Sequence, residues 1–464
     1  MQIPIINGIY TDEASDFRSS YPRNLVPVPK QHGISNGYLR PADGIVALNT
    51  GTGVDRGAIN WNGVCYRVMG TSLISIAEDG TPTTLGVIPG TNLVRFDYSF
   101  DRLSIAADNK LYYWNGSTLS QVTDLDLGTV IDQMWVDGYF MTTDGESLVV
   151  TELADPTSVL PTKYGSSEID PDPIKALLKL NNEPHVLNRY TIEVFDNIGG
   201  SGFPFQRIEG AMIERGVVGT RACCVFGDVI AFVGSKRNEP CAVWLAATGS
   251  SVKISTREID SILLKYTEQN LSEILLESRI EKSHEWLYIH LPDQTLVYDA
   301  NSSKLMQEPV WFTLGSSIKK GIYRARNMVW CYNKWIVGDT STANIGSLSN
   351  EVGEHWGLTV GWEFGTIIIY NEGRGSLFHE LELVCLPGRA ALGKDPTIYT
   401  EYSLDGESWS TPKFVKAGKI GERLKRIVWL GQGSMDHIRM QRFKGTSDAR
   451  LSFARLEARI EGLN

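Results

Sequence analysis

Short strands separated by tight turns recur along most of this chain, and their spacing constrains the fold more than any other feature. From Ala47 to about Ile345, similar strand-and-turn units return every 40 to 50 residues or so, the repeat length typical of propeller blades. In the first unit, hairpins about Asn62-Gly63 and Asp79-Gly80 join four strands, the content of one blade. No blade signature repeats, so a pair of β-sandwiches is the structural alternative.

The fold class predicted from this pattern is all-β, with three segments. We expect an N-terminal extended arm over residues 1–45, a β-propeller-like domain of about six blades over residues 46–345, and a C-terminal β-sandwich domain over residues 346–464. A stretch rich in Ser, Thr, Asn and Gly, from Thr340 to Glu354, marks the second boundary. Beyond it, six or more segments alternate apolar and polar residues, which favours a sandwich.

Prolines define the predicted arm. Pro4, Pro22, Pro27, Pro29 and Pro41 lie in a segment with little periodicity. Because proline lacks a backbone N–H and favours extended backbone, such a segment lies along a surface. The surface belongs either to the chain itself or to a partner subunit, and the residues leave both open.

Two short helices are predicted near residues 255–278, inside the strand-rich region. Ser255 and Glu258 have the spacing of a capping box, and apolar residues follow at helical intervals. A hairpin comes next, with strands over 286–291 and 295–299 and a turn at Pro292-Asp293. A second interruption, the proline-rich stretch 155–173, is predicted to be a long surface loop, which either contacts another protein or is merely variable.

The charge balance argues against tight wrapping of nucleic acid. With 44 basic and 54 acidic side chains the net charge is −10, which repels a phosphate backbone. The densest basic patch is expected to be a solvated face of a sheet, and it consists of Lys413, Lys416, Lys419, Arg423, Lys425 and Arg426. No signal peptide and no apolar run of about 20 residues is present, so we predict no membrane span and folding in a cytoplasm.

Residues with reactive side chains form no recognisable site. His284 and His290 are expected to be packed or hydrogen-bonded, and Glu168, Asp170 and Asp172 are expected to be solvated, although they could bind a hard cation or act as a glycosidase pair. The six cysteines have no metal-ligand spacing and are expected to be free thiols. The glycines of Asn197–Phe203 lack the setting of a phosphate-binding loop. We therefore predict no catalytic, cofactor-binding or metal-binding residue and no cofactor.

Several sequence segments, in order, resemble the packaged-DNA stabilisation proteins, or tail-hub proteins, of short-tailed phages. The matching segments are Tyr21–Lys30, Gly37–Arg40 with Gly44-Ile45, Glu258–Thr267, Ser283-His284, Ile289–Pro292, Leu296–Ser303 and, more weakly, Tyr323-Arg324 with Gly338-Asp339. They span most of the first 345 residues, and the last 115 or so resemble the family only in character.

The resemblance implies a structural virion protein rather than an enzyme. It implies a homo-hexameric ring, the tail hub or nozzle, placed below the portal and its adaptor ring. The ring would contact the tail needle and the tailspike or tail fibre. It would close the DNA channel, retain the packaged double-stranded DNA and conduct it, without specific binding, during ejection.

The alternative function is a propeller glycosidase or sialidase acting on host polysaccharide. It is suggested by the blade spacing and by the hairpin Tyr402–Trp409, which approaches an Asp box but is one residue short between Asp405 and Trp409. That function requires complete Asp boxes, paired carboxylates in a central pocket and an arginine cluster. The sequence offers none of these clearly, and a plain hairpin is the simpler interpretation of Tyr402–Trp409.

Overall fold

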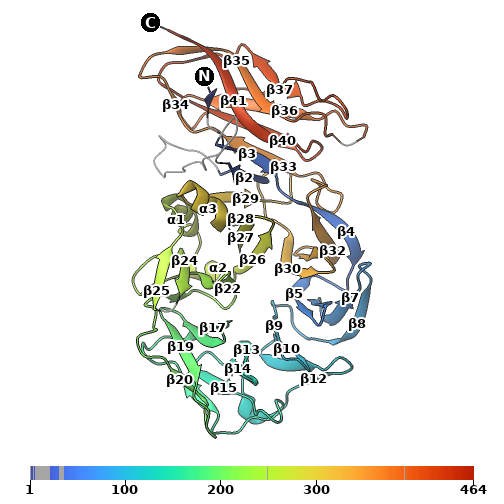
Figure 1. The fold of residues 1–464 in the computed structure, drawn as a ribbon, viewed down its shortest axis with the longest axis vertical. Coiled ribbons are helices and arrows are strands. Elements are labelled where there is room, and N and C mark those ends of the chain that lie inside the picture. The colour runs from blue at the N-terminus through green and yellow to red at the C-terminus, as the bar shows by residue number, and fades with distance from the viewer. Residues whose placement is uncertain are drawn as a thin grey trace. The chain divides into compact units, whose positions relative to one another are not determined.

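The computed structural model describes residues 2, 3, 5, 21–30, 36–247, 249–390 and 392–463, with 51% of the chain in strands and 5% in helices (Figure 1). Contacts divide the chain into two compact units. Unit 1 contains Met1–Val46, Ile280–Tyr323 and Leu348–Asn464, and unit 2 contains Ala47–Arg279 and Arg324–Ser347. Within the described part, no helix has the length and apolar character needed to cross a membrane.

Unit 2 is a series of antiparallel sheets formed by consecutive strands. The first sheet contains β5 (Asp55–Trp61), β6 (Val64–Met69), β7 (Ser72–Ile76) and β8 (Pro82–Val87). The second contains β9 (Arg95–Tyr98), β10 (Leu103–Ala107), β11 (Lys110–Trp114) and β12 (Leu119–Gln121). The third contains β13 (Asp132–Val136), β14 (Tyr139–Thr143), β15 (Ser147–Val150) and β16 (Tyr164–Ser166).

Three further sheets follow in the same manner. The fourth contains β17 (Ile174–Leu180), β18 (Glu183–Asn188), β19 (Ile192–Asn197) and β20 (Phe205–Arg207). The fifth contains β21 (Gly216–Val217), β22 (Cys223–Phe226), β23 (Val229–Ser235), β24 (Ala242–Ala247) and β25 (Ser250–Lys253). The sixth sheet contains β26 (Leu275–Glu281), β27 (His284–His290), β28 (Thr295–Asp299) and β29 (Val310–Leu314). The chain passes from unit 2 into unit 1 within β26.

The last sheet of the series includes β4, a strand that comes before the first sheet in the chain. Its order is β30 (Ala325–Cys331), β31 (Lys334–Asp339), β32 (Asn344–Ser349) and β4 (Gly44–Thr50). Next to β4, the N–H of Gly51 donates to the carbonyl of Ala343 at 2.7 Å. The described residues from Gly44 to Ser349 therefore hold seven sheets, one more than the six or so blades that the spacing predicts.

Tight turns place the strands of each sheet, as the sequence predicts. Asn62 and Gly63 have φ of 53° and 80°, and Asp137 and Gly138 have φ of 49° and 89°. Two successive residues with positive φ give the turn whose twist matches antiparallel strands. The flanking pairs Trp61–Val64 and Val136–Tyr139 accordingly close two-residue hairpins.

Hydrophobic side chains between successive sheets form the core of unit 2. One cluster joins the first two sheets through residues such as Trp61, Leu73 and Ile105, and another joins the third and fourth through Met141, Leu148 and Leu177. Burying each large apolar side chain contributes about 1.5–3 kcal/mol. The face-to-face stacking of sheets is the packing of a β-propeller.

Unit 1 contains a β-sandwich whose two sheets enclose one hydrophobic core, which includes Phe364, Phe378 and Phe453. The first sheet has the order β2 (Leu25–Pro29), β3 (Gly37–Pro41), β41 (Phe453–Gly462), β35 (Ser376–Cys385) and β38 (Val428–Leu430), with β1 (Gln2–Ile3) on β41 and β39 (Ser434–Met435) on β35. The second has the order β33 (Gly361–Gly365), β40 (Ile438–Thr446), β36 (Thr397–Ser403) and β37 (Lys413–Lys416), with β34 (Ile369–Tyr370) on β40.

The predicted arm thus contributes strands to the sandwich of its own chain, in the part of it that the structure describes. Leu39 pairs with Phe453, and Ile3 pairs with Leu456. Leu25 and Leu39 are fully buried in the sandwich core. Residues 6–20 and 31–35 of the predicted arm lie outside the described residues.

Both predicted helices are present, with one correction to their capping. They are α1 (Arg257–Leu263) and α2 (Glu268–Ser272). Thr256, not Ser255, is the N-cap of α1, and it accepts from the N–H of Ile259. The Ser255 hydroxyl instead donates to Asp260 at 2.6 Å and accepts from the N–H of Val243.

Candidate functional site

The first strands of neighbouring sheets in unit 2 contact one another, and a pocket of about 620 Å³ opens beside them. Asn92, Asn109, Thr220 and Arg326 are among the residues that line it. A second pocket, of about 260 Å³, shares Leu93 and Arg221 with the first. Ligands and substrates bind in such pockets, so the charged side chains beside these two determine whether this part of unit 2 could act as an active site.

Asp132 links three of these first strands. Its carboxylate lies 3.4 Å from Nε of Arg95 on β9 and 3.8 Å from the Arg221 guanidinium before β22, and it accepts from the N–H of Leu177 on β17 at 2.9 Å. Burial, and next the charge of Arg95, lower the pKa of Arg221 to about 10. Asp132 is fully buried and engaged in these contacts, so it acts as a structural link between blades rather than as a free base.

Asp55 and Glu277 are committed in the same way. Asp55 accepts two hydrogen bonds of 3.0 Å from the Arg67 guanidinium, and a third, of 2.6 Å, from the side-chain amide of Asn327. Glu277 accepts from the backbone N–H groups of Asn327 and Met328 at 2.7 and 2.9 Å. Burial raises the pKa of Glu277 although both N–H groups favour its charged form.

These buried charges are the feature that sequence reasoning missed. Some are isolated charges in an apolar or neutral strand context, such as Arg95 between Val94 and Phe96, and an isolated charge of this kind is the signal for a buried ion pair. The partner of Asp55, Arg67, lies on the neighbouring strand of the same sheet, whereas the partner of Arg95, Asp132, lies on another sheet, and neither pairing is visible in the sequence. These ion pairs and hydrogen bonds hold strands of unit 2 together. Because the named carboxylates are engaged in them, they are not free to exchange a proton with a substrate.

In unit 1, Asp299 organises the hairpin of β27 and β28. The fully buried carboxylate is 2.6 Å from Nδ1 of His284 and accepts from Nε1 of Trp286 at 3.0 Å. It also accepts from the N–H and the hydroxyl of Ser302, and so caps α3 (Ala300–Met306), a helix that the sequence analysis did not predict. A hydroxyl, an imidazole and a carboxylate meet here, but Ser302 donates to the carboxylate and not to the imidazole, unlike the order of a catalytic triad.

His290 lies on the same strand as His284 and has a packing role. Its ring stacks on the rings of Tyr288 and Tyr323, and Nδ1 is 3.3 Å from the hydroxyl of Thr295. The two histidines are thus packed and hydrogen-bonded, as the sequence predicts.

Two carboxylates of the acidic cluster in the long loop make ion-pair or hydrogen-bond contacts. Asp170 pairs with Arg237 at 3.0 Å, and Asp172 accepts from the N–H of Tyr190. No group of three or more His, Cys, Asp or Glu residues able to hold a metal ion occurs among the described residues.

The hairpin that approaches an Asp box is an Asx-type turn. Asp405 accepts from the N–H groups of Glu407 and Ser408, each at 2.8 Å. Trp409 lies under the guanidinium of Arg442, and the distance from the guanidinium carbon to the ring centre is 3.8 Å.

All six cysteines are free thiols. Burial raises the pKa of Cys223 to about 12, which keeps this thiol protonated and unreactive.

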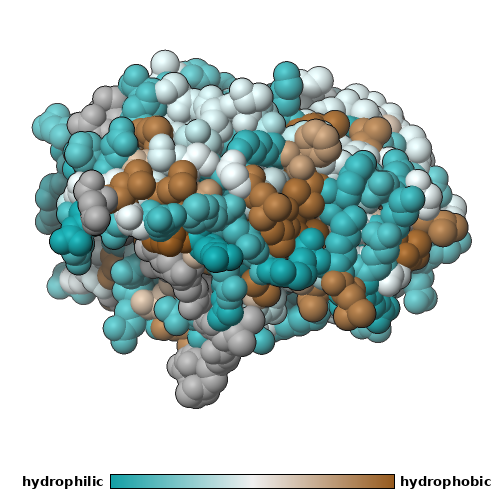
Figure 2. Space-filling model, turned by 90° about the horizontal axis from the view of Figure 1, so that it is seen from above, coloured by the Kyte–Doolittle hydropathy of each residue, from teal (hydrophilic) through white to brown (hydrophobic). Residues whose placement is uncertain are grey.

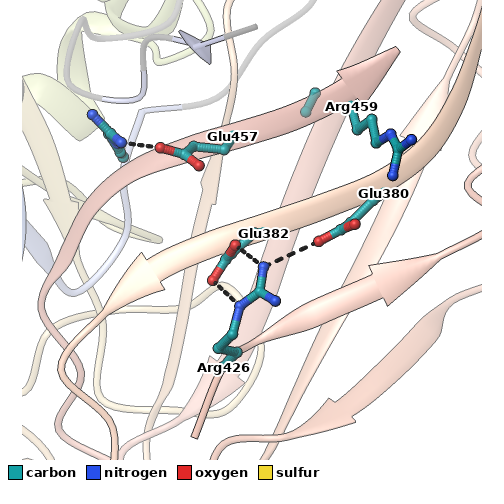
Figure 3. Close-up of a pocket in the computed structure, with 7 residues that line it drawn as sticks. Glu380, Glu382, Arg426, Glu457 and Arg459 are labelled. Carbon is teal, nitrogen blue, oxygen red and sulfur yellow. Dashed lines mark hydrogen bonds and ion pairs between the residues drawn. The ribbon is translucent and has the colours of Figure 1, made fainter. Parts of the chain in front are cut away.

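The exposed face of the first sandwich sheet carries interleaved charges around a shallow pocket of about 470 Å³ (Figure 3). Arg426 points at Glu380 and Glu382, which lie two residues apart on β35 and therefore on one face (Figure 3). On β41, Arg459 stands opposite Glu380 and Glu457 opposite Glu382. Part of the predicted basic patch is thus neutralised here, whereas Lys419 and Arg423 have no carboxylate within ion-pair distance among the described residues.

Comparison with known families matches nearly the whole chain. The model of the family described as "Bacteriophage P22 Gp10, beta-propeller" matches residues 1–353, and that of "Bacteriophage P22 Gp10, beta-sandwich" matches residues 361–461. The tail hub protein gp10 of Salmonella phage P22 is 27% identical over 377 residues, which cover 76% of this chain and 78% of the relative.

Comparison with solved structures gives weaker likenesses. The WD40 domain of Neurospora crassa Pan2 has a TM-score of 0.41 at 9% identity, covering 64% of this chain and 90% of that chain. The extracellular domain of BT4673 from B. thetaiotaomicron has a TM-score of 0.42 at 10% identity, covering 85% of this chain and 56% of that chain. Both scores are too low to support an argument about fold or function.

Proposed function

Because this chain belongs to the bacteriophage P22 Gp10 family, whose β-propeller and β-sandwich it carries in the same order, we propose that it is the hub of a short phage tail. The protein is a structural component of the virion tail. The match to both family models, which together cover most of the chain, is the observation that carries the proposal.

In this proposal, six copies form a closed ring below the portal and its adaptor ring. The ring extends the DNA channel, retains the packaged genome and contacts the tail needle and the tailspike or tail fibre. A ring of identical subunits needs one heterologous interface that repeats until it closes.

The charge of the chain supports passage of DNA without binding. Unit 2 has 30 acidic and 21 basic side chains, a net charge of −9, whereas unit 1 has 24 and 23, a net charge of −1. A negative surface repels phosphates and disfavours the release of counterions that drives non-specific binding. DNA is therefore retained sterically by the closed tube and moves freely once the tube opens.

We also propose that the protein is not an enzyme. The glycosidase alternative requires two carboxylates free to act as acid and nucleophile or base. In unit 2, Asp55, Asp132 and Glu277 are buried and bound by guanidinium or amide groups. No specific observation favours the second function.

Complementation of hub-deficient particles tests the proposal. The purified chain is mixed with DNA-filled particles that carry the portal and adaptor but lack this protein, and the bound copies are counted by native mass spectrometry of the released tails. We expect six copies per particle and restored retention of DNA. A chain that does not add to the particles, or that releases sugars from bacterial surface polysaccharide, would contradict the proposal.

A further inference from the structure

Two adjacent loops of the sandwich expose apolar side chains surrounded by positive charge. They are residues 386–390 with 392–395, and residues 413–426, which begin with β37; we call them the basic loops, and they have eight basic and two acidic side chains between them. The N–H of Gly421 donates to the carbonyl of Gly388 at 3.2 Å, which places the loops side by side. Leu424 is 97% exposed between Arg423 and Lys425, and Leu392 is 86% exposed. On the face of the molecule in Figure 2, hydrophobic groups likewise emerge between hydrophilic ones.

Among the described residues, three cations of the basic loops make no side-chain hydrogen bond or ion pair, and a fourth, Lys413, donates only to the carbonyl of Gly431. Lys416 and Lys425 pair with Asp395 and Glu422 at 3.5 and 3.6 Å. In the part of the chain that the structure describes, Arg389, Lys419 and Arg423 are exposed, and no carboxylate lies within 4 Å of their charged groups. Apolar and positive groups left exposed together are typical of an interaction surface.

Unit 2 exposes apolar side chains among negative charges. Residues 101–172 contain 13 acidic and three basic side chains, a net charge of −10. Exposed leucines lie among them, and Leu125, between Asp124 and Asp126, is 94% exposed. The acidic edge consists of Asp124, Asp126, Asp144, Glu146 and Asp155 with Leu125, Leu153 and Leu160.

Hydrogen bonds join the segment around Asp124 and Asp126 to the loop that contains Val159 and Tyr164. The carboxylate of Asp124 accepts from the N–H of Val159 at 3.0 Å, and the hydroxyl of Tyr164 donates to the carbonyl of Asp126. Burial, followed by the charges of Asp126, Asp144 and Asp124, raises the pKa of Tyr164. Among the described residues, none of the five carboxylates of the acidic edge has a basic side chain within ion-pair distance.

The two surfaces match in charge and in form. Arg423-Leu424-Lys425 and Asp124-Leu125-Asp126 each present an almost fully exposed leucine between two like charges, and the signs are opposite. We propose that the basic loops of one copy dock on the acidic edge of the next copy, and that this contact is the repeating interface of the ring. The inference rests on the proposed function, since a closed ring of identical copies needs the same head-to-tail contact between every two neighbours.

A second copy fits the basic loops better than DNA does. DNA would satisfy the cations of the basic loops, but it would leave Leu424 and Leu392 in water and cannot approach the acidic edge. A copy of this chain buries leucines of both surfaces and pairs their charges, and opposite charges around an apolar centre also fix which partner docks.

Charge reversal tests the interface, because each surface can be inverted alone. One variant is K419E/R423E, and the other is D126K/E146K; no side-chain hydrogen bond or ion pair is made by any of these four residues in the described structure. We expect each variant alone to lose ring formation on hub-deficient particles by about a hundredfold, because like charges face each other. The control K265E/K304E makes the same change of net charge as K419E/R423E, at exposed sites outside both surfaces, and should assemble normally.

Mixing gives the decisive result. In an equimolar mixture, alternating copies pair an inverted loop with an inverted edge and an unchanged loop with an unchanged edge, so we expect rings to form again. An even-numbered ring permits strict alternation, and the rescue shows that both variants are folded. Rings formed by either variant alone, or no rescue on mixing, would overturn the interface while leaving the proposed function standing if the unaltered chain forms rings.

The same assay separates the other occupants of the basic loops. If K419E/R423E forms rings but no longer retains DNA, the loops contact DNA and the interface is overturned. If the unaltered chain adds no ring to the particles, both the proposed function and the interface are overturned.

Discussion

Asp299 shows how one side chain holds a whole segment of unit 1. Its carboxylate receives hydrogen bonds from a strand tryptophan and from the first turn of α3, and it faces the imidazole of His284. Because the carboxylate is fully buried, its removal would break all of these contacts in a place that water does not reach.

We therefore expect Asp299→Ala to lower the free energy of unfolding by about 3 kcal/mol or more, through lost capping and orphaned buried donors. Urea denaturation followed by circular dichroism measures the change. Glu308→Ala is the matched control, since Glu308 is exposed and makes no side-chain contact in the described structure, and it should shift the midpoint little. Equal midpoints for the two variants would contradict the role of Asp299.

Glu401 makes unit 1 sensitive to acid. Burial alone would raise the pKa of Glu401, but hydrogen bonds from Arg442 and Lys444 outweigh it, and the pKa lies below its usual value of 4.5. A lowered folded-state pKa gives stability that is present above the unfolded-state value and is lost as the pH falls through the folded-state value.

The wild-type chain should thus lose stability below about pH 4.5 more steeply than Glu401→Gln, which cannot titrate at this position. Thermal unfolding between pH 3 and pH 7 or so, followed by near-ultraviolet circular dichroism, provides the comparison. Parallel curves for the two proteins would show that Glu401 is not the group responsible.

At the scale of elements, local patterns predicted strands and turns well. Asn62-Gly63 and Asp137-Gly138 close hairpins because these residues accept positive φ. In the predicted hairpin, β28 has the expected bounds, whereas β27 begins two residues earlier and ends one residue earlier than predicted. Helix α3 could not be predicted from its own residues, because Asn301, Ser302 and Ser303 are weak helix formers. It is stabilised locally by its N-cap Asp299 and further by the burial of Ala300, Ser302 and Ser303, and only the burial is a tertiary effect.

The strands near the N-terminus illustrate a second limit of sequence reasoning. Their prolines predicted an extended segment, but β3 pairs with β41 more than 400 residues away, a register that no local signal encodes. Whether the surface under this segment belonged to the same chain or to a partner was open from sequence, and the described residues lie on the same chain.

Hydrogen exchange on the monomeric protein tests this pairing. We expect amides of β2 and β3 to exchange at least about a hundredfold more slowly than those of the exposed loop 419–424, because Leu25 and Leu39 are fully buried in the sandwich core. Fast exchange of β2 and β3 in the monomer, with protection only after assembly, would show instead that this segment is ordered by a neighbouring subunit.

At the scale of the molecule, charge separates the two units. Unit 2 carries nearly all of the net negative charge, and unit 1 is close to neutral, with eight of its 23 basic side chains on the basic loops. The sequence showed the total charge and the basic patch, but the acidic edge emerges only when Asp124, Asp144 and Asp155 are brought together by the fold. Of the two surfaces of the proposed interface, the basic loops could therefore be recognised in the sequence and the acidic edge could not.

The most direct test of the account is the number of copies that the purified chain adds to DNA-filled particles lacking a hub, measured by native mass spectrometry. The account predicts six copies per particle, with packaged DNA retained afterwards and no change in the DNA itself. Addition of a single copy or none, with DNA leaking from the particles as before, would contradict the proposal that this propeller and sandwich form the ring that closes a phage tail.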